Sequence, residues 1–125
     1  MRNYSKKLVN LCIKNGIKIS LAESCTGGLI SSKLIGVENV SKILDYGIVT
    51  YSNNSKIHFL KVPKHILEKH GAVSRETAEA MVYGLSDLSE TNFSMAVTGI
   101  AGPGGESKDK PIGLVYHSFF SKNSK

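Results

Sequence analysis

Apolar and polar positions along the chain follow two patterns that alternate from the N-terminus onward. In one pattern, apolar residues recur every three or four positions, as on one face of a helix. In the other, short runs are apolar, β-branched or aromatic at most positions, as in buried strands. The first pattern predicts helices at residues 4–15, 26–34, 63–70 and from 75 onward, and the second predicts strands at 17–22, 46–51, 93–98 and 112–120.

Residues at the ends of these segments support the assignment. Asn15 and Gly16 end the first predicted helix. Ser74 is a favourable N-cap for the longest one, and Glu76 places a negative charge in its first turn. The inward face of this helix is predicted to consist of Ala78, Met81, Val82 and Leu85.

The predicted elements are joined by segments with loop composition. Residues 36–42 are predicted to form a loop with a short turn, and residues 52–54 a turn after a strand. A glycine-rich loop is predicted at residues 99–110. The alternation of strands and helices favours an α/β fold with a parallel or mixed sheet covered on both faces. With 125 residues, one domain over residues 1–125 is expected.

Three strand ends carry polar residues or glycine. If the first three strands run parallel, Glu23-Ser24, Tyr51-Ser52 and Thr98-Gly99 meet at one edge of the sheet. Ligands of open α/β sheets bind at this carboxyl edge. The topology therefore predicts a functional site there.

Charge narrows the class of ligand. Sixteen Lys and Arg against ten Asp and Glu give a net charge of +6. Because no basic run is interleaved with aromatic residues, we expect an anionic small-molecule substrate rather than nucleic acid.

The remaining composition excludes several other classes. Two cysteines, Cys12 and Cys25, make neither a disulfide framework nor a zinc motif, which fits a reducing cytoplasm. The four histidines show no metal-ligand spacing, so no metal is expected. The N-terminal residues lack an apolar signal core, and no apolar run is long enough to span a membrane. We expect a cytoplasmic protein without a membrane partner.

Ser24 is the first candidate nucleophile, because it stands directly after a predicted buried strand. It could equally be the N-cap of the helix predicted from residue 26. Cys25 is an alternative nucleophile, since a helix start lowers the pKa of a thiol, although a small buried cysteine is also common.

Lys56 is the candidate base, because it lies just beyond a strand end and can reach back toward Ser24. To accept a proton at neutral pH it needs a pKa well below the usual value of about 10.4, which burial can produce. Otherwise it is an exposed surface lysine. Tyr51 could orient or relay the proton, or could simply pack as a strand residue.

Two glycine-containing segments are candidate anion-binding elements. Residues 25–28, Cys25-Thr26-Gly27-Gly28, follow the candidate nucleophile, and their backbone N–H groups could stabilise an oxyanion. The second segment is neither a Walker loop nor a dinucleotide-binding motif, but its N–H groups could face a phosphate. The substrate-binding residues predicted there are Thr98, Gly99, Gly102, Gly104 and Gly105.

These motifs together resemble the C-terminal domain family of the competence-damage-inducible protein CinA. The resemblance covers nearly the whole chain and is carried by residues 22–28, by residues 49–53 with Lys56, by residues 70–74, by residues 98–103 with Gly105, and by residues 110–115.

The resemblance implies a three-layer α/β/α sandwich with a mixed, mostly parallel sheet. It also implies an amidohydrolase that deamidates nicotinamide mononucleotide to nicotinate mononucleotide and ammonia, without a cofactor. In the family a serine and a lysine carry the chemistry with help from a tyrosine, and these roles map onto Ser24, Lys56 and Tyr51.

One departure from the family pattern lies at the C-terminus. Family domains continue past the strand at residues 112–120 with a C-terminal helix bearing arginines, whereas this chain stops at Lys125. The missing helix would leave sheet surface exposed and could favour a homo-oligomer. The alternative function is therefore a catalytically inactive, nucleotide-binding remnant of the same family.

Overall fold

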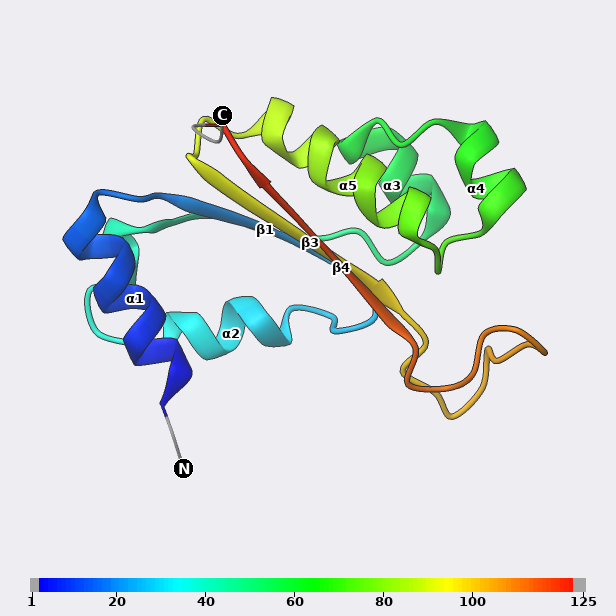
Figure 1. Ribbon diagram of the computed structural model, residues 1–125, viewed down its shortest axis with the longest axis horizontal. Coiled ribbons are helices and arrows are strands. Elements are labelled where there is room, and N and C mark those ends of the chain that lie inside the picture. The colour runs from blue at the N-terminus through cyan, green and yellow to red at the C-terminus, as the bar shows by residue number, and fades with distance from the viewer. Residues whose placement is uncertain (1–2, 123–125) are drawn as a thin grey trace.

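The computed structural model describes residues 3–122, which form one four-stranded sheet with helices on both faces (Figure 1). The strand order is β2-β1-β3-β4. The strands are β1 (Ile19–Glu23), β2 (Leu44–Val49), β3 (Phe93–Gly99) and β4 (Val115–Ser121). β1 pairs parallel with both β2 and β3, and β4 runs antiparallel to β3. The mixed, mostly parallel sheet predicted from the sequence is confirmed.

The helices divide between the two faces of the sheet. On one face lie α1 (Tyr4–Asn15) and α2 (Leu29–Ile35). On the other lie α3 (Asn53–Leu60), α4 (Lys64–His70) and α5 (Arg75–Leu88). A 3-10 turn, η1 (Val40–Lys42), precedes β2. The fold is therefore the three-layer α/β/α sandwich that was predicted.

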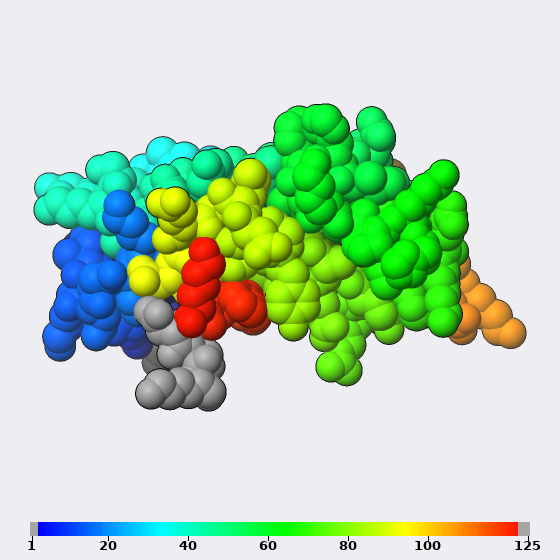
Figure 2. All heavy atoms as spheres, turned by 90° about the horizontal axis from the view of Figure 1, so that it is seen from above, coloured from blue at the N-terminus to red at the C-terminus, as the bar shows by residue number. Residues whose placement is uncertain are grey.

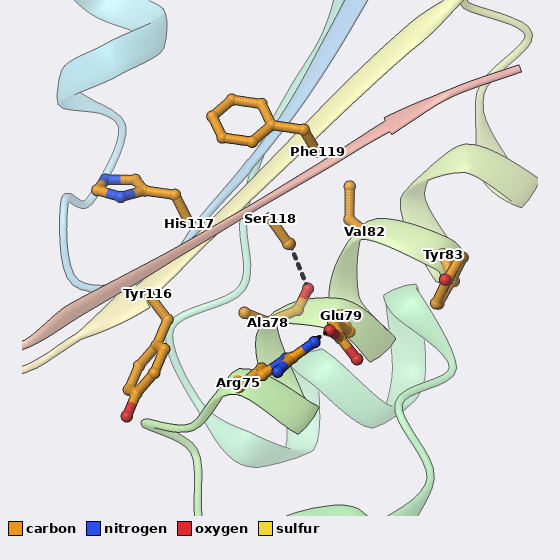
Figure 3. Close-up of a pocket in the computed structure, with 9 residues that line it drawn as sticks. All are labelled: Arg75, Ala78, Glu79, Val82, Tyr83, Tyr116, His117, Ser118 and Phe119. Atoms are coloured by element: carbon orange, nitrogen blue, oxygen red, sulfur yellow. Dashed lines mark hydrogen bonds and ion pairs between the residues drawn. The ribbon is translucent and has the colours of Figure 1, made fainter. Parts of the chain in front are cut away.

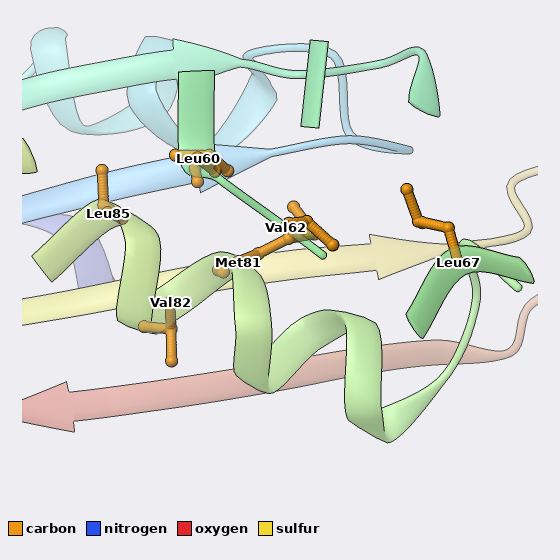
Figure 4. Close-up of a cluster of buried hydrophobic side chains, with 8 residues drawn as sticks. Leu60, Val62, Leu67, Met81, Val82 and Leu85 are labelled. Carbon is orange, nitrogen blue, oxygen red and sulfur yellow. The ribbon is translucent and has the colours of Figure 1, made fainter. Parts of the chain in front are cut away.

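Each face of the sheet has its own hydrophobic core. Between β1 and β3 and the helices α3–α5, the buried cluster includes Leu60, Met81, Leu85 and Ala96 (Figure 4). On the α1–α2 face, a second cluster includes Val9, Leu21 and Leu34. Because β1 contributes to both clusters, it is buried at every position, as expected for a central parallel strand.

Helix α5 follows its sequence prediction closely. The Ser74 hydroxyl accepts a hydrogen bond from the Thr77 amide at 3.1 Å, which caps the helix. All four residues of the predicted inward face are buried. Gly84 lies so close to α3 that a Cβ at this position would come 1.7 Å from the Leu60 carbonyl oxygen. This close approach fixes α3, which carries Lys56, against α5.

The structure corrects several element boundaries. Residues 52–54, predicted as a turn, begin α3, with Ser52 as its N-cap. The helix predicted from residue 26 begins at Leu29, because residues 25–28 form a turn. β2 ends at Val49, so Tyr51 lies outside it, and the last strand begins at Val115 rather than at residue 112.

The space-filling view shows where the remaining segments reach the surface. Seen from the side of α3, α4 and α5, the loop after β3 (orange) projects beyond α4 at one end of the molecule (Figure 2). Figure 1 places the same loop at that end, near the carboxyl ends of β1 and β3.

Candidate functional site

The carboxyl ends of the three parallel strands meet at one edge of the sheet, as predicted, and backbone hydrogen bonds join them. The Thr50 amide donates to the Glu23 carbonyl at 2.9 Å, and the Ser24 amide donates to the Val97 carbonyl at 3.0 Å. These bonds continue the sheet by one residue beyond the strands. As a result, Ser24 is held at the centre of the edge with little freedom to move.

Lys56 reaches Ser24 from helix α3. Its Nζ lies 2.9 Å from Ser24 Oγ and donates to the carbonyl oxygens of Thr50 at 2.7 Å and Tyr51 at 2.9 Å. The Lys56 side chain is completely buried, which is rare for lysine. The prediction that Lys56 reaches Ser24 is confirmed, and the alternative of an exposed surface lysine is wrong.

Burial lowers the pKa of Lys56 from 10.5 to about 8, against a smaller opposing effect of the nearby Cys25. About a tenth of the side chains are then neutral at pH 7. A neutral amine has two N–H groups and one lone pair. The geometry suits this form, because the two N–H groups can donate to Thr50 and Tyr51 while the lone pair accepts the Ser24 hydroxyl proton.

Ser24 does not cap a helix. Helix α2 begins five residues later, and its N-cap is Gly28. The N-cap interpretation of Ser24 is therefore wrong, and the residue, which is 6% exposed, lines a cavity. Cys25 lines the same cavity, but burial raises the pKa of its thiol. This thiol is thus less easily ionised than an ordinary one, whereas Ser24 has a base in contact.

Tyr51 contributes its main chain to the site. Its carbonyl accepts a hydrogen bond from Lys56. The residue also lines the cavity and is 74% exposed. The relay role of the hydroxyl stays a prediction.

Glu23 is buried behind the site and organises the turn after β1. Its carboxylate accepts hydrogen bonds from the Thr26 hydroxyl, the Ile30 amide, and the amide and hydroxyl of Ser31, at 2.7–3.0 Å. Burial by itself raises the pKa of Glu23, but these hydrogen bonds outweigh it and the pKa is lowered. Glu23 is therefore a fixed anion that orients the turn.

The residues of this turn are placed differently from the prediction. Thr26, Gly27 and Gly28 do not line the cavity beside Ser24. Gly27 and Gly28 adopt φ values of +57° and +100°, which let the chain turn sharply. The Gly27 amide donates to the Ser24 carbonyl at 3.1 Å, so it is already engaged. Of residues 25–28 only Cys25 lines the cavity, so its amide is the candidate oxyanion donor of this segment.

The cavity has a volume of about 320 Å³ and is open on one side. Six predicted substrate-binding residues line it: Cys25, Thr98, Gly99, Gly102, Gly104 and Gly105. Four other lining residues, Ala72, Val73, Ile100 and Ala101, were not predicted as site residues; Ala72 and Val73 form part of the wall. The signal for Ala72 and Val73 was the motif at residues 70–74, which entered only through the family resemblance, and Ile100 and Ala101 lie within the predicted glycine-rich loop. The Thr98 hydroxyl donates to the Ala72 carbonyl at 2.8 Å, so it holds this wall in place.

A second hollow lies between α5 and β4 (Figure 3). It contains an ion pair between Arg75 and Glu79, with 2.9 Å between Nε and Oε1, and Tyr116 lines the same hollow. None of the predicted site residues lines it. The chemistry predicted from the sequence therefore belongs to the cavity at Ser24.

Within residues 3–122, no group of three or more His, Cys, Asp and Glu side chains is placed to hold a metal ion. No helix there has the length and apolar character needed to cross a membrane.

The fold and the buried serine–lysine pair define an α/β protein with a candidate nucleophile at the carboxyl edge of its sheet. The family model "CinA C-terminal domain" matches residues 1–125. The chain belongs to this family.

Known proteins similar to the chain carry related names. It is 50% identical over 109 residues to a CinA-like protein of Kosmotoga olearia, covering 87% of this chain and 26% of that protein. The crystal structure of the competence/damage inducible protein CihA of Agrobacterium tumefaciens is 43% identical, with a TM-score of 0.94. That alignment covers 97% of this chain and 73% of the solved one.

A CinA superfamily protein of Escherichia coli is 32% identical, with a TM-score of 0.90, over 96% of this chain and 70% of that structure. Among the curated relatives, the chain spans about a quarter of the length of the Kosmotoga protein.

Proposed function

We propose that the protein is an amidohydrolase that converts nicotinamide mononucleotide to nicotinate mononucleotide and ammonia. The observation that carries the proposal is the 2.9 Å contact between the buried Lys56 amine and the Ser24 hydroxyl at the mouth of a cavity. A serine needs an adjacent base to become nucleophilic, and a desolvated lysine is one such base. The choice of nicotinamide mononucleotide as the substrate rests on the family resemblance.

In the first half of the reaction, neutral Lys56 accepts the hydroxyl proton while Ser24 Oγ forms a bond to the carboxamide carbon. The carbonyl π electrons move to oxygen, and the Cys25 amide stabilises the oxyanion. When the intermediate collapses, the C–N bond breaks. Protonated Lys56 delivers its proton to the leaving nitrogen, with Tyr51 in the predicted assisting role, and ammonia departs.

In the second half, water attacks the resulting ester. Lys56 accepts a proton from this water, and the tetrahedral intermediate expels the Ser24 oxygen, which regains a proton from Lys56. The products are the free carboxylic acid and the original enzyme. The proton balance closes without a metal or an organic cofactor.

The cavity wall is compatible with a nucleotide. It is built mostly from backbone and small side chains, and none of its thirteen lining residues is acidic. Backbone N–H groups of Ala101, Gly102, Gly104 and Gly105, which line the cavity, are candidates for binding the 5′-phosphate or the ribose. The net charge of +6 favours the approach of an anion.

The test is ammonia release from nicotinamide mononucleotide by the purified chain and by Ser24→Ala, Lys56→Ala and Cys25→Ala. We expect losses of at least about a thousandfold in kcat for the first two, because the nucleophile or its base is gone. Cys25→Ala is the matched control and should retain most activity. If Cys25→Ala alone is inactive, the nucleophile is Cys25.

A second candidate function is nucleotide binding without turnover. The observation that favours it is the exposed side chain of Tyr51, whose contact with Lys56 is made by the carbonyl rather than by the hydroxyl. Titration calorimetry with nicotinamide mononucleotide, run beside the ammonia assay, separates the two functions. Heat of binding without ammonia release would support the binding module.

A further inference from the structure

The loop between β3 and β4 makes one wall of the cavity but is itself poorly packed. Between residues 101 and 113, all residues except Gly102 and Lys110 are exposed. Its base is closed by two backbone hydrogen bonds, from the Ile100 amide to the Leu114 carbonyl at 2.9 Å and from the Gly113 amide to the Ile100 carbonyl at 2.7 Å. Beyond this base, two backbone hydrogen bonds between Ser107 and Lys110 close the tip of the loop on itself.

Lys110 ties this loop to another part of the chain. Its Nζ donates to the carbonyl of His70 at 2.7 Å, a contact that spans forty residues. His70 is the last residue of α4, where carbonyl groups lack helical partners and a positive charge is favourable. The contact is partly buried, so solvent competes with it only in part. Figures 1 and 2 place the loop and α4 at the same end of the molecule.

The segment that receives Lys110 is rigid. The Gly71 carbonyl accepts hydrogen bonds from the hydroxyls of Ser74 at 3.0 Å and Thr77 at 2.6 Å. The next carbonyl, that of Ala72, accepts from Thr98. Three successive carbonyls, of residues 70–72, are thus engaged by side chains. The loop is therefore attached to a fixed wall.

The tether joins two segments that both line the cavity. Ala72 and Val73 follow His70 by two and three residues, and Gly102, Gly104 and Gly105 belong to the loop that carries Lys110. Lys110 itself is not among the lining residues. Its direct contact with His70 can therefore influence a ligand by setting the position of the glycine segment relative to the wall.

We propose that Lys110 is a positioning residue for substrate binding, which holds the glycine-rich loop against the 70–73 wall so that its backbone N–H groups face the ligand. This proposal rests on the proposed function for the identity of the ligand. Ordering a free loop on binding costs conformational entropy, and a tether removes part of that cost in advance.

The expected consequence is a change in KM with little change in kcat. Ser24 and Lys56 are positioned by β1 and α3, and none of the contacts described for them involves the loop beyond Ile100. Loss of a charge-assisted hydrogen bond typically changes an equilibrium constant by about 10- to 100-fold. Because the Lys110–His70 hydrogen bond is only partly buried, we expect a change in KM of about tenfold.

The first test compares kcat and KM for nicotinamide mononucleotide in Lys110→Met, Lys110→Arg and Lys108→Met. Lys108 lies in the same loop and is exposed, so it controls for loss of a positive charge. We expect KM to rise about tenfold in Lys110→Met with kcat within about threefold, substantial recovery in Lys110→Arg, and no change in Lys108→Met. Equal KM values in Lys110→Met and wild type would overturn the proposal, as would a loss confined to kcat.

A second test needs no substrate and separates this proposal from the proposed function. Glu106 lies in the exposed part of the loop and offers a site for a glutamate-specific protease. Cleavage there should be about five- to tenfold faster in Lys110→Met than in Lys108→Met, because the untethered loop opens more often. Unchanged cleavage at Glu106 refutes the tether whatever the activity. If cleavage accelerates equally at Glu79 in α5, Lys110 stabilises the whole fold and is not a positioning residue.

If the wild type releases no ammonia, the proposed amidohydrolase function has failed, and the binding half of the Lys110 proposal is decided by calorimetry. Weaker binding of the mononucleotide to Lys110→Met than to Lys108→Met supports the proposal. Equal or absent binding by all variants overturns it.

Discussion

The buried amine of Lys56 makes the proposed activity depend on pH in a specific way. Only the neutral amine can accept the Ser24 proton, and its pKa is lowered from 10.5 to about 8. The neutral fraction is then about one tenth at pH 7, one half at pH 8 and nearly all at pH 9.5. We expect kcat/KM to rise about tenfold between pH 7 and 9.5 and to level off above 8.5.

The assay is ammonia release at low concentrations of nicotinamide mononucleotide, where kcat/KM reports the free enzyme. Measurements start at pH 7, because the phosphate of the substrate ionises near pH 6. The reasoning is refuted if kcat/KM keeps rising tenfold per pH unit beyond 9.5, which would describe an ordinary lysine. A profile that is flat from pH 7 upward would remove Lys56 as the base.

The same pKa makes a prediction about stability that needs no substrate. Between pH 8 and 10.5 the unfolded chain binds more protons at Lys56 than the folded one, so the free energy of unfolding rises with pH in this window. A shift from 10.5 to about 8 corresponds to about 3 kcal/mol at most. Urea unfolding of wild type and Lys56→Met over this range measures the difference, and parallel curves would contradict the lowered pKa.

Three further predictions concern the supporting structure. Gly84→Ala should lower the free energy of unfolding by about 2 kcal/mol or more and reduce activity, because its Cβ would strike the Leu60 carbonyl and displace α3. The control in urea unfolding is Gly36→Ala, whose Cβ would make ordinary contacts, and its free energy of unfolding should be nearly unchanged. Glu23→Gln should cost about 1–3 kcal/mol at pH 7, because a buried acceptor of four hydrogen bonds is replaced. Since the pKa of Glu23 is lowered, this advantage of the wild type is present above 4.5 and disappears as the pH falls through the folded pKa, which thermal unfolding at pH 7 and in acid would show. Met81→Ala, at a fully buried position, should cost about 2–5 kcal/mol by the urea midpoint, and a smaller loss would mean that the core around it collapses into the space.

Much of the fold could be predicted from local pattern. The buried residues of α5 recur with helical spacing, and Ser74 marks where the helix begins. β1 is apolar enough to be recognised as a central strand. The meeting of the three strand ends followed from the crossovers, because parallel strands deliver their carboxyl ends to one edge. For the same reason Ser24, Lys56 and the glycine segment could be placed together before the structure was known.

Helix α3 could not be predicted in this way. Its buried residues, Lys56 and Leu60, are four positions apart as a helix requires, but one of them is charged, so no apolar periodicity is visible. Ser52-Asn53-Asn54 has turn composition, and the same residue types also cap helices. Gly84 of α5 lets this helix pack closely, and such a long-range contact leaves no trace in the local pattern.

The amino-acid sequence by itself determined the layers of this protein, the edge at which its chemistry gathers and the residues present there. Only the tertiary structure decided what those residues do to one another. It buried Lys56, and so lowered its pKa, by packing α3 on α5. It brought the Glu23 carboxylate within hydrogen-bond distance of Thr26, Ile30 and Ser31. It also formed the hydrogen bond from Lys110 to the His70 carbonyl, forty residues away. Local pattern records propensity and burial, whereas the pKa of an amine or the position of a loop depends on which distant groups surround it.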